Sequence, residues 1–170
     1  MSYIRKPLSY THCLYPCVHC YSLPENVSFE EGALAEPLSV LIHASRRAAL
    51  STSQTVLVYG VGTIGLLACA LAKSYGCSRV VAVDINETRL SFAKTHGFAE
   101  DVFCLSACPK AKSPEEQLRR ARETADCLLE AFGENNGFDV VFECTGAEPC
   151  IQMAIHVRDS PSVFPGYKVN

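Results

Sequence analysis

The sequence has little that would assign it to a secreted or strongly charged class of protein. Its opening stretch, MSYIRKPLSYTHC, has no apolar segment and no small-residue cleavage site, so secretion is not expected. The net charge of −3 gives no reason to expect nucleic acid or an anionic membrane as a partner. With 48% apolar and 19% charged residues, it has the balance of an ordinary globular protein, and we expect a cytoplasmic location.

An uninterrupted membrane-spanning run is also missing. Positions 48–72 contain no charge, and the apolar stretch 55–72 is close to the length of a membrane span. Gly60, Gly62 and Gly65 interrupt this stretch in a pattern that ends a strand and begins a helix. We therefore expect a buried strand, a turn and a buried helix, with no membrane partner.

Ten cysteines is a high count for 170 residues, but they are scattered rather than spaced as a disulfide framework. Free thiols packed as small apolar side chains are the favoured interpretation, with disulfide bonds as the alternative. Cys17 and Cys20 have a spacing that zinc sites use, and His12, Cys13 and His19 lie nearby. Because a second such pair is missing, we expect no bound metal there.

From position 51 the sequence alternates between buried strands and helices. Continuous apolar runs predict strands at 55–59, 79–83, 101–105 and 138–143. Capping residues and helical periodicity predict helices at 63–75, 86–97, 113–132 and 147–157. This alternation predicts an α/β fold, an incomplete doubly wound (Rossmann) parallel sheet of about four strands.

Four segments follow from this pattern. We expect an irregular remnant over 1–22, a helical segment over 23–50, a dinucleotide-binding domain over 51–157 and an irregular tail over 158–170. In the helical segment, Ser28 and Glu31 have the spacing of a capping box, and Pro37 suits the first turn of a second helix.

A Gly-x-Gly-x-x-Gly motif joins the first predicted strand of the domain to its helix, the context that a dinucleotide-binding fingerprint requires. Gly60 allows a sharp turn, Gly62 leaves room for a pyrophosphate, and Gly65 lets the helix pack closely on the strand. The helix that begins at Thr63 would offer unpaired N–H groups to the phosphates. A glycine-rich turn without a ligand is the alternative.

Asp84 ends the second predicted strand, 24 residues after Gly60. A carboxylate at this place accepts hydrogen bonds from the adenosine ribose and repels a 2′-phosphate, so NAD is expected rather than NADP. A turn or helix-capping role together with Asn86 is the alternative, and the two roles are compatible. Arg89 could accommodate a 2′-phosphate, but with Asp84 present we still expect NAD.

Residues 23 to about 157 resemble the medium-chain zinc-dependent alcohol dehydrogenases, and within them the sorbitol and polyol dehydrogenases. The stretches that carry the resemblance are LPENVSFEEGALAEPLSVLIHASRR, VLVYGVGTIGLLACALAKSYG, VVAVDINETRLSFAK and FECTGAEPCIQMAI. The resemblance implies an oxidoreductase that transfers hydride from a polyol CH–OH group to NAD.

The resemblance also implies roles for individual residues. Ile64, Asp84 and Arg89 fall on positions that hold NAD in the sorbitol dehydrogenases, and Thr145 lies at the end of the fourth strand where the cofactor runs. Glu36 falls on the glutamate that faces the catalytic zinc and the substrate, with a solvated residue before a proline as the alternative.

Other parts of the family pattern have no match in this sequence. Zinc is expected for the family, but the barrel-like domain that supplies its ligands is represented only by a stub, and the fifth and sixth strands of the sheet are missing. We therefore expect a chain that is not competent alone, or that associates with a full-length relative or with itself. The alternatives are a catalytically silent nucleotide-binding or interaction module and a fragment without function.

Overall fold

The computed structural model describes the backbone of residues 3–8 and 11–16, and residues 21–106, 111, 113–134 and 136–157 with their side chains. The chain divides into two compact units, Met1–Ala35 and Glu36–Asn170. The predicted tail at 158–170 and the zinc-like spacing of Cys17 and Cys20 lie outside the described residues.

The first unit contains a two-stranded antiparallel sheet of β1 (Tyr3–Leu8) and β2 (Thr11–Pro16). The expectation that positions 1–22 are irregular was wrong for these two stretches. The strands contain Pro7 and Pro16, but both strands of a two-stranded sheet are edge strands, where a residue without an N–H is tolerated.

The short helix α1 (Phe29–Ala33) follows in the same unit and begins at the predicted capping box. The Ser28 hydroxyl accepts a hydrogen bond from the Glu31 N–H at 3.2 Å, and the Glu31 carboxylate accepts one from the Ser28 N–H at 2.8 Å. These reciprocal bonds satisfy two N–H groups that the helix leaves unpaired, which explains why the helix begins at this residue.

The second unit is built on a four-stranded parallel sheet in the order β5-β4-β3-β6. Its strands are β3 (Thr55–Tyr59), β4 (Arg79–Asp84), β5 (Asp101–Cys104) and β6 (Val140–Glu143). Its helices are α2 (Ala35–Arg47), which spans the boundary between the units, and α3 (Thr63–Ser74), α4 (Glu87–Thr95), α5 (Pro114–Phe132) and α6 (Glu148–His156). The predicted α/β fold with a parallel sheet of four strands is confirmed.

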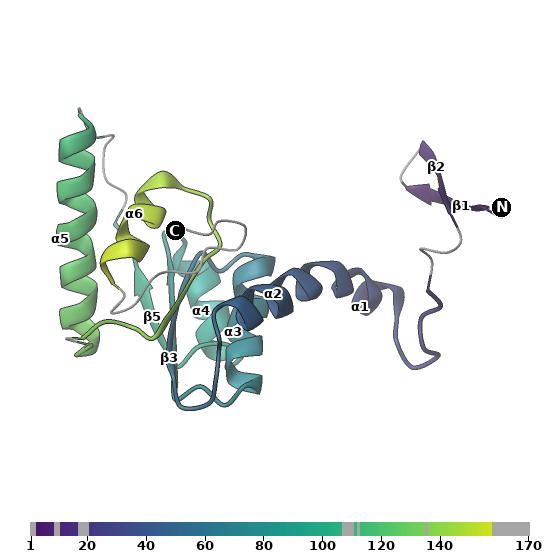
Figure 1. Cartoon of the computed structure of the whole chain (residues 1–170), viewed down its shortest axis with the longest axis horizontal. Coiled ribbons are helices and arrows are strands. Elements are labelled where there is room, and N and C mark those ends of the chain that lie inside the picture. The colour runs from purple at the N-terminus through teal and green to yellow at the C-terminus, as the bar shows by residue number, and fades with distance from the viewer. Residues whose placement is uncertain are drawn as a thin grey trace. The chain divides into compact units, whose positions relative to one another are not determined.

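Helices cover both faces of this sheet, and Figure 1 shows α5 and α6 on one side and α3 and α4 on the other. Val56 and Val58 of β3 pack toward α3, whereas Leu57 and Tyr59 pack toward α5 and α6. All four side chains are fully buried, which explains why the strand sequences show no alternation of polar and apolar residues.

The compact unit begins earlier than the boundary predicted at position 51. Leu41 and Ala44 of α2 are buried in the same apolar cluster as α3 and α4, so this helix belongs to the core of the sheet domain. The apolar run at 55–72 is divided between β3 and α3, as predicted. Among the described residues no helix combines the length and the apolar composition needed to cross a membrane.

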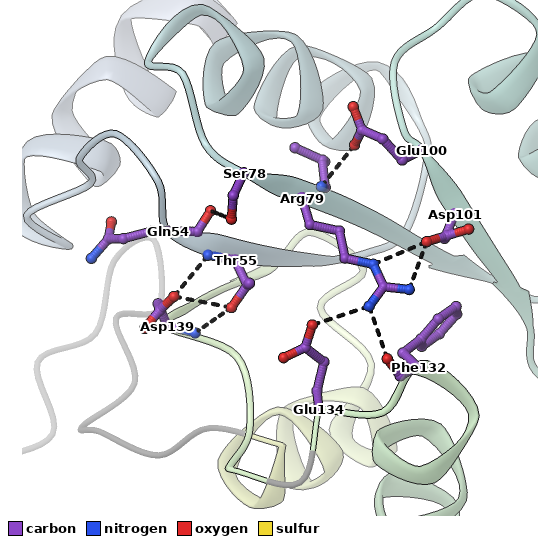
Figure 2. A network of polar contacts seen from close by, with 10 residues as sticks. Gln54, Thr55, Ser78, Arg79, Glu100, Asp101, Phe132, Glu134 and Asp139 are labelled. Atoms are coloured by element: carbon purple, nitrogen blue, oxygen red, sulfur yellow. Dashed lines mark hydrogen bonds and ion pairs between the residues drawn. The ribbon is translucent and has the colours of Figure 1, made fainter.

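Side-chain hydrogen bonds lock the amino ends of the strands (Figure 2). Asp139, just before β6, accepts from both the N–H and the hydroxyl of Thr55 at the start of β3, at 2.7 and 3.0 Å. Arg79 at the start of β4 bonds to Asp101 of β5 at 2.7 Å and to the carbonyl of Phe132 at 2.8 Å. This edge of the sheet is therefore occupied by its own polar groups, and the loops after β3, β4 and β6 lie at the opposite, carboxyl edge.

Candidate functional site

The loop between β3 and α3 turns sharply at the carboxyl edge of the sheet. Gly60 has a φ of +84° and its N–H donates to the Val83 carbonyl of the neighbouring strand at 2.7 Å. A Cβ at this position would lie 2.6 Å from the methyl group of Thr145, in the loop that follows β6. Glycine is therefore required by both the backbone conformation and the close approach of the two loops.

Gly62 and Gly65 differ in the space available for a side chain. A Cβ at Gly65 would stand 1.7 Å from the Gly60 carbonyl oxygen, because helix α3 packs directly on the turn. A Cβ at Gly62 would have no heavy atom of the described residues within 4 Å, and the backbone there has an ordinary φ of −73°. Gly62 is thus not required by the fold, and the open space beside it is where a fingerprint glycine admits a pyrophosphate.

The amino end of α3 offers hydrogen-bond donors to this space. No side chain caps the helix at Gly62, and the first turn closes when Leu66 donates to the Gly62 carbonyl at 2.9 Å. Among the described residues, the N–H groups of Gly62, Thr63, Ile64 and Gly65 have no acceptor. Four such donors at the positive end of a helix dipole suit the oxygens of a phosphate group.

Asp84 connects this loop to the next one. The residue is 8% exposed at the end of β4, where its Oδ2 accepts from the Val61 N–H at 2.8 Å and its Oδ1 accepts from the Asn86 N–H at 2.9 Å. The turn role considered from the sequence is therefore real. A carboxylate can accept about four hydrogen bonds, so capacity remains for ribose hydroxyls.

Arg89 lies in the first turn of α4, which Asn86 caps by accepting from the Arg89 N–H at 3.1 Å. The Arg89 side chain is exposed. The structure thus places Asp84 and Arg89 on the two sides of the short turn between β4 and α4.

Glu143 is a buried carboxylate that the sequence analysis did not select. It ends β6 and is 9% exposed; its Oε1 accepts from the N–H and the hydroxyl of Thr145, and its Oε2 accepts from the Gly146 N–H at 3.0 Å. A signal was present in the sequence, because an acid ending an apolar strand before Thr-Gly matches the placement of Asp84 at the end of β4.

Thr145 is exposed at this edge, but its hydrogen-bonding capacity is mostly used within its own loop. Its hydroxyl donates to Glu143 and accepts from the Ala147 N–H at 2.9 Å. A hydroxyl has one hydrogen to donate, so Thr145 can only accept from a ligand. A ribose hydroxyl or a carboxamide N–H would suit it, whereas a phosphate, which only accepts, would not.

Glu36 differs from Asp84 and Glu143 because its side chain is exposed. It is exposed in the first turn of α2, and its backbone carbonyl accepts from the Ser39 hydroxyl at 2.7 Å. In the part of the chain that the structure describes, no group of three His, Cys, Asp or Glu side chains is arranged to hold a metal ion. The described residues therefore do not supply a zinc site around Glu36.

The described cysteines are all free thiols, as the favoured interpretation predicted. Burial raises the pKa of Cys69 and of Cys144 to about 12. Cys104 and Cys127 are exposed and line a cavity of about 230 Å³ between the end of β5 and α5. The described thiols thus comprise one buried thiol, Cys69, three of intermediate exposure and the exposed pair.

Known proteins with similar sequences place the chain in a family. The family model described as "Zinc-binding dehydrogenase" matches residues 63–160. D-xylulose reductase A of Aspergillus niger is 41% identical over 138 residues, which cover 81% of this chain and 35% of that protein. The chain thus spans about a third of the length of this relative.

Solved structures agree on the fold. A zinc-binding dehydrogenase of Sinorhizobium meliloti 1021, bound to NADP, matches with a TM-score of 0.72 and 23% identity over 94% of this chain and 44% of its own. An alcohol dehydrogenase of Escherichia coli CFT073, complexed with NADH, matches with a TM-score of 0.70 and 22% identity over 90% of this chain and 41% of its own. The resemblance to zinc-dependent and polyol dehydrogenases is confirmed, and the chain belongs to the zinc-binding dehydrogenase family.

Proposed function

We propose that this chain binds NAD(H) and is the cofactor-binding part of a polyol dehydrogenase. The observation that carries the proposal is the junction at the carboxyl end of β3. There an open position at Gly62 adjoins four N–H groups that have no acceptor in the described part of the chain, and the carboxylate of Asp84 stands at the end of the next strand. This combination suits a diphosphate followed by a ribose.

Each part of the cofactor has a proposed place. The diphosphate lies against the amino end of α3, from Gly62 to Gly65, and the adenosine ribose lies at Asp84. The two structural relatives hold NADP and NADH respectively, so the fold itself accepts either cofactor. The choice therefore depends on local residues, and the negative charge of Asp84 favours NAD because it repels a 2′-phosphate.

The substrate class is proposed from the similarity to D-xylulose reductase A. Reduction of that ketose yields a polyol, so we place the substrate among polyols and their ketoses. When bound, a nicotinamide cofactor supplies the hydride acceptor for a CH–OH group. The residues of this chain bind and orient that cofactor, and no step is assigned to zinc because the described residues do not form a ligand set for it.

The Gly62→Ala variant tests the proposed cofactor site. A Cβ here meets no protein atom, so the unliganded stability should change by no more than about 1 kcal/mol. The same Cβ would intrude on a diphosphate, and NADH affinity should fall by at least about tenfold. Both quantities can be measured on the 170-residue chain, by thermal unfolding and by NADH titration calorimetry.

Gly65→Ala is the contrasting variant. Its Cβ would overlap the Gly60 carbonyl oxygen, so it should lower stability even without cofactor. In the wild type, NADH at a hundred times its Kd should add about 2.7 kcal/mol to the free energy of unfolding. Absence of any NADH-dependent stabilisation in the wild type, or unchanged binding by Gly62→Ala, would contradict the proposal.

Turnover is tested separately from binding. Xylitol or sorbitol is supplied with NAD and zinc, and NADH formation is followed by absorbance at several protein concentrations. NADH formation would show that the chain completes a catalytic site by itself or through association. Binding without formation of NADH would assign this chain the cofactor-binding role alone.

A further inference from the structure

Two buried carboxylates stand on either side of the central strand β3 at its carboxyl end. Asp84 ends β4, Glu143 ends β6, and both strands pair directly with β3. Their exposed fractions are 8% and 9%, and neither forms an ion pair with any described residue. Each carboxylate is instead stabilised by hydrogen bonds from the loop that follows its own strand, and Asp84 by one from the β3–α3 loop as well.

The loop that Glu143 organises differs chemically from the start of α3. Glu143 accepts the N–H groups of Thr145 and Gly146, and the Thr145 hydroxyl accepts the N–H of Ala147. Three successive backbone donors are thus consumed within the loop, whereas those of Gly62 to Gly65 are unpaired among the described residues. The loop after β6 therefore has no free backbone donors for a phosphate. Its conformation is fixed by its own hydrogen bonds, and the Thr145 hydroxyl can still accept a hydrogen bond from a ligand.

The strand order indicates which half of the cofactor would lie against the loop after β6. β4 and β5 lie on one side of β3, and β6 lies on the other, so the order reverses between β3 and β6. A dinucleotide in a doubly wound sheet crosses the carboxyl edge at such a reversal. If Asp84 holds the adenosine ribose on the β4 side, the nicotinamide half extends over the β6 side.

From this geometry we infer that Glu143 is a positioning residue for the nicotinamide half of the cofactor, an inference that rests on the proposed function. Glu143 fixes Thr145 so that its methyl group lies close to Gly60, and one lone pair of its hydroxyl has no donor among the described residues. Without the carboxylate, the N–H and hydroxyl of Thr145 and the N–H of Gly146 lose their acceptors. The loop is then free to turn these donors toward the cofactor or the solvent.

The diphosphate loop does not depend on Glu143. Its turn is held by the bond from Gly60 to the Val83 carbonyl and by the bond from Val61 to Asp84. ADP contains the adenosine and diphosphate parts of the cofactor and lacks the nicotinamide riboside. ADP binding should therefore report on the α3 side of the site, and NADH binding on both sides.

The test compares the two ligands on Glu143→Gln. Glutamine keeps the size of the side chain, but its amide nitrogen is a donor and cannot accept from the loop. NADH affinity of the full chain should fall by about tenfold, and ADP affinity by less than about twofold. Glu148→Gln is the matched control, because Glu148 is exposed in the first turn of α6 and its carboxylate accepts a hydrogen bond from the Gln152 side chain on the same helix. This control should bind both ligands as the wild type does.

The ratio of the two affinities separates positioning from general support of the fold. Equal weakening of NADH and ADP binding in Glu143→Gln, or no weakening of either, overturns the inference while the proposed function stands. A wild-type chain that binds neither ligand overturns the proposed function first. If Glu143→Gln does not fold, Thr145→Val removes the hydroxyl at nearly constant shape and should show the same selective loss of NADH affinity, and Thr145→Ser should restore it.

Discussion

At Asp84 one carboxylate serves two loops and the proposed ligand together. Its two oxygens fix the N–H groups of Val61 and Asn86, which sets the shape of the phosphate loop before any cofactor arrives. A preorganised loop avoids the cost of ordering its backbone on binding. The buried negative charge adds selectivity, because it repels a 2′-phosphate at this place and Asp84 takes part in none of the ion pairs of the described residues.

Asp84→Asn tests the selectivity at nearly constant shape. The amide oxygen can keep one of the two loop bonds, so stability should fall by about 1–3 kcal/mol as the other N–H loses its acceptor. Removal of the charge should raise the ratio of NADPH to NADH affinity by at least about tenfold. Asp126→Asn, an exposed change on α5, is the control and should leave this ratio unchanged. An unaltered ratio in Asp84→Asn would place cofactor choice elsewhere.

The sequence could predict the residues whose type alone is diagnostic, and it missed those defined by contacts. Gly60 and Gly65 were expected where a turn and a close approach occur, since only glycine lacks the Cβ. Glu143 has only a positional signal, an acid at the end of an apolar strand, because its role depends on the hydroxyl and N–H groups of the loop after β6. Thr145 was expected at the cofactor, but its hydroxyl hydrogen proves to be used by Glu143.

At the scale of elements, the two edges of the sheet have different tasks. The amino edge is closed by polar side chains that tie strands to one another, with Arg79 at their centre (Figure 2). The carboxyl edge keeps donors and acceptors open in the loops after β3 and β4. Because hydrogen bonds and ion pairs at the amino edge hold the strand register, the loops at the carboxyl edge can keep unpaired groups.

The Arg79→Ala variant tests how much the polar network at the amino edge contributes to stability. The guanidinium bonds to Asp101, to Glu134 and to the Phe132 carbonyl, and it lies 5.3 Å from the centre of the Phe132 ring. Its loss should lower the free energy of unfolding by about 1–3 kcal/mol, measured by urea denaturation.

Arg119→Ala is the matched control on α5. Arg119 forms one exposed ion pair with Glu123, four residues further along the helix, and its removal should cost less than about 0.5 kcal/mol. A similar loss in the two variants would mean that the network around Arg79 does not act as a unit. NADH affinity should be unchanged in both, because neither arginine lies at the carboxyl edge.

Element types along the sheet domain could be predicted because the apolar pattern changes with each element. β3, β4 and β6 read as continuous apolar runs, and capping residues such as Asn86 and Ser113 mark the helix starts. The β1–β2 pair was not predicted, because Pro7 and Pro16 read as breaks, although the two strands pair as neighbours in the sequence, from Leu8 with Thr11 to Tyr3 with Pro16. The inclusion of α2 in the domain depends likewise on the packing of Leu41 and Ala44, which periodicity suggests but cannot assign to a partner.

At the scale of the whole molecule, the stability of the sheet domain depends on ionisable groups that stay neutral inside its core. Cys69 of α3 is fully buried and Cys144 follows β6, and burial raises the pKa of each thiol from 9.0 to about 12. Burial likewise raises the pKa of the Tyr59 hydroxyl, which has no hydrogen-bond partner among the described residues. All three groups favour the folded state only in their protonated forms.

The last prediction is therefore a loss of stability in alkali. In the unfolded chain a thiol ionises near pH 9, whereas in the folded domain Cys69 and Cys144 stay protonated until about pH 12. Their contribution is complete below pH 9 and is lost as the pH rises from 9 toward 12, by about 1.4 kcal/mol per thiol for each pH unit. Urea denaturation at pH 8, 9 and 10 under reducing conditions measures this slope.

The double variant Cys69→Ala, Cys144→Ala should show a shallower slope than the wild type, whatever its stability at pH 8. Cys127→Ala is the control and should keep the wild-type slope, because its thiol is open to solvent whether the chain is folded or not. Equal slopes in all three proteins would show that the buried thiols do not govern the alkaline limit of this fold.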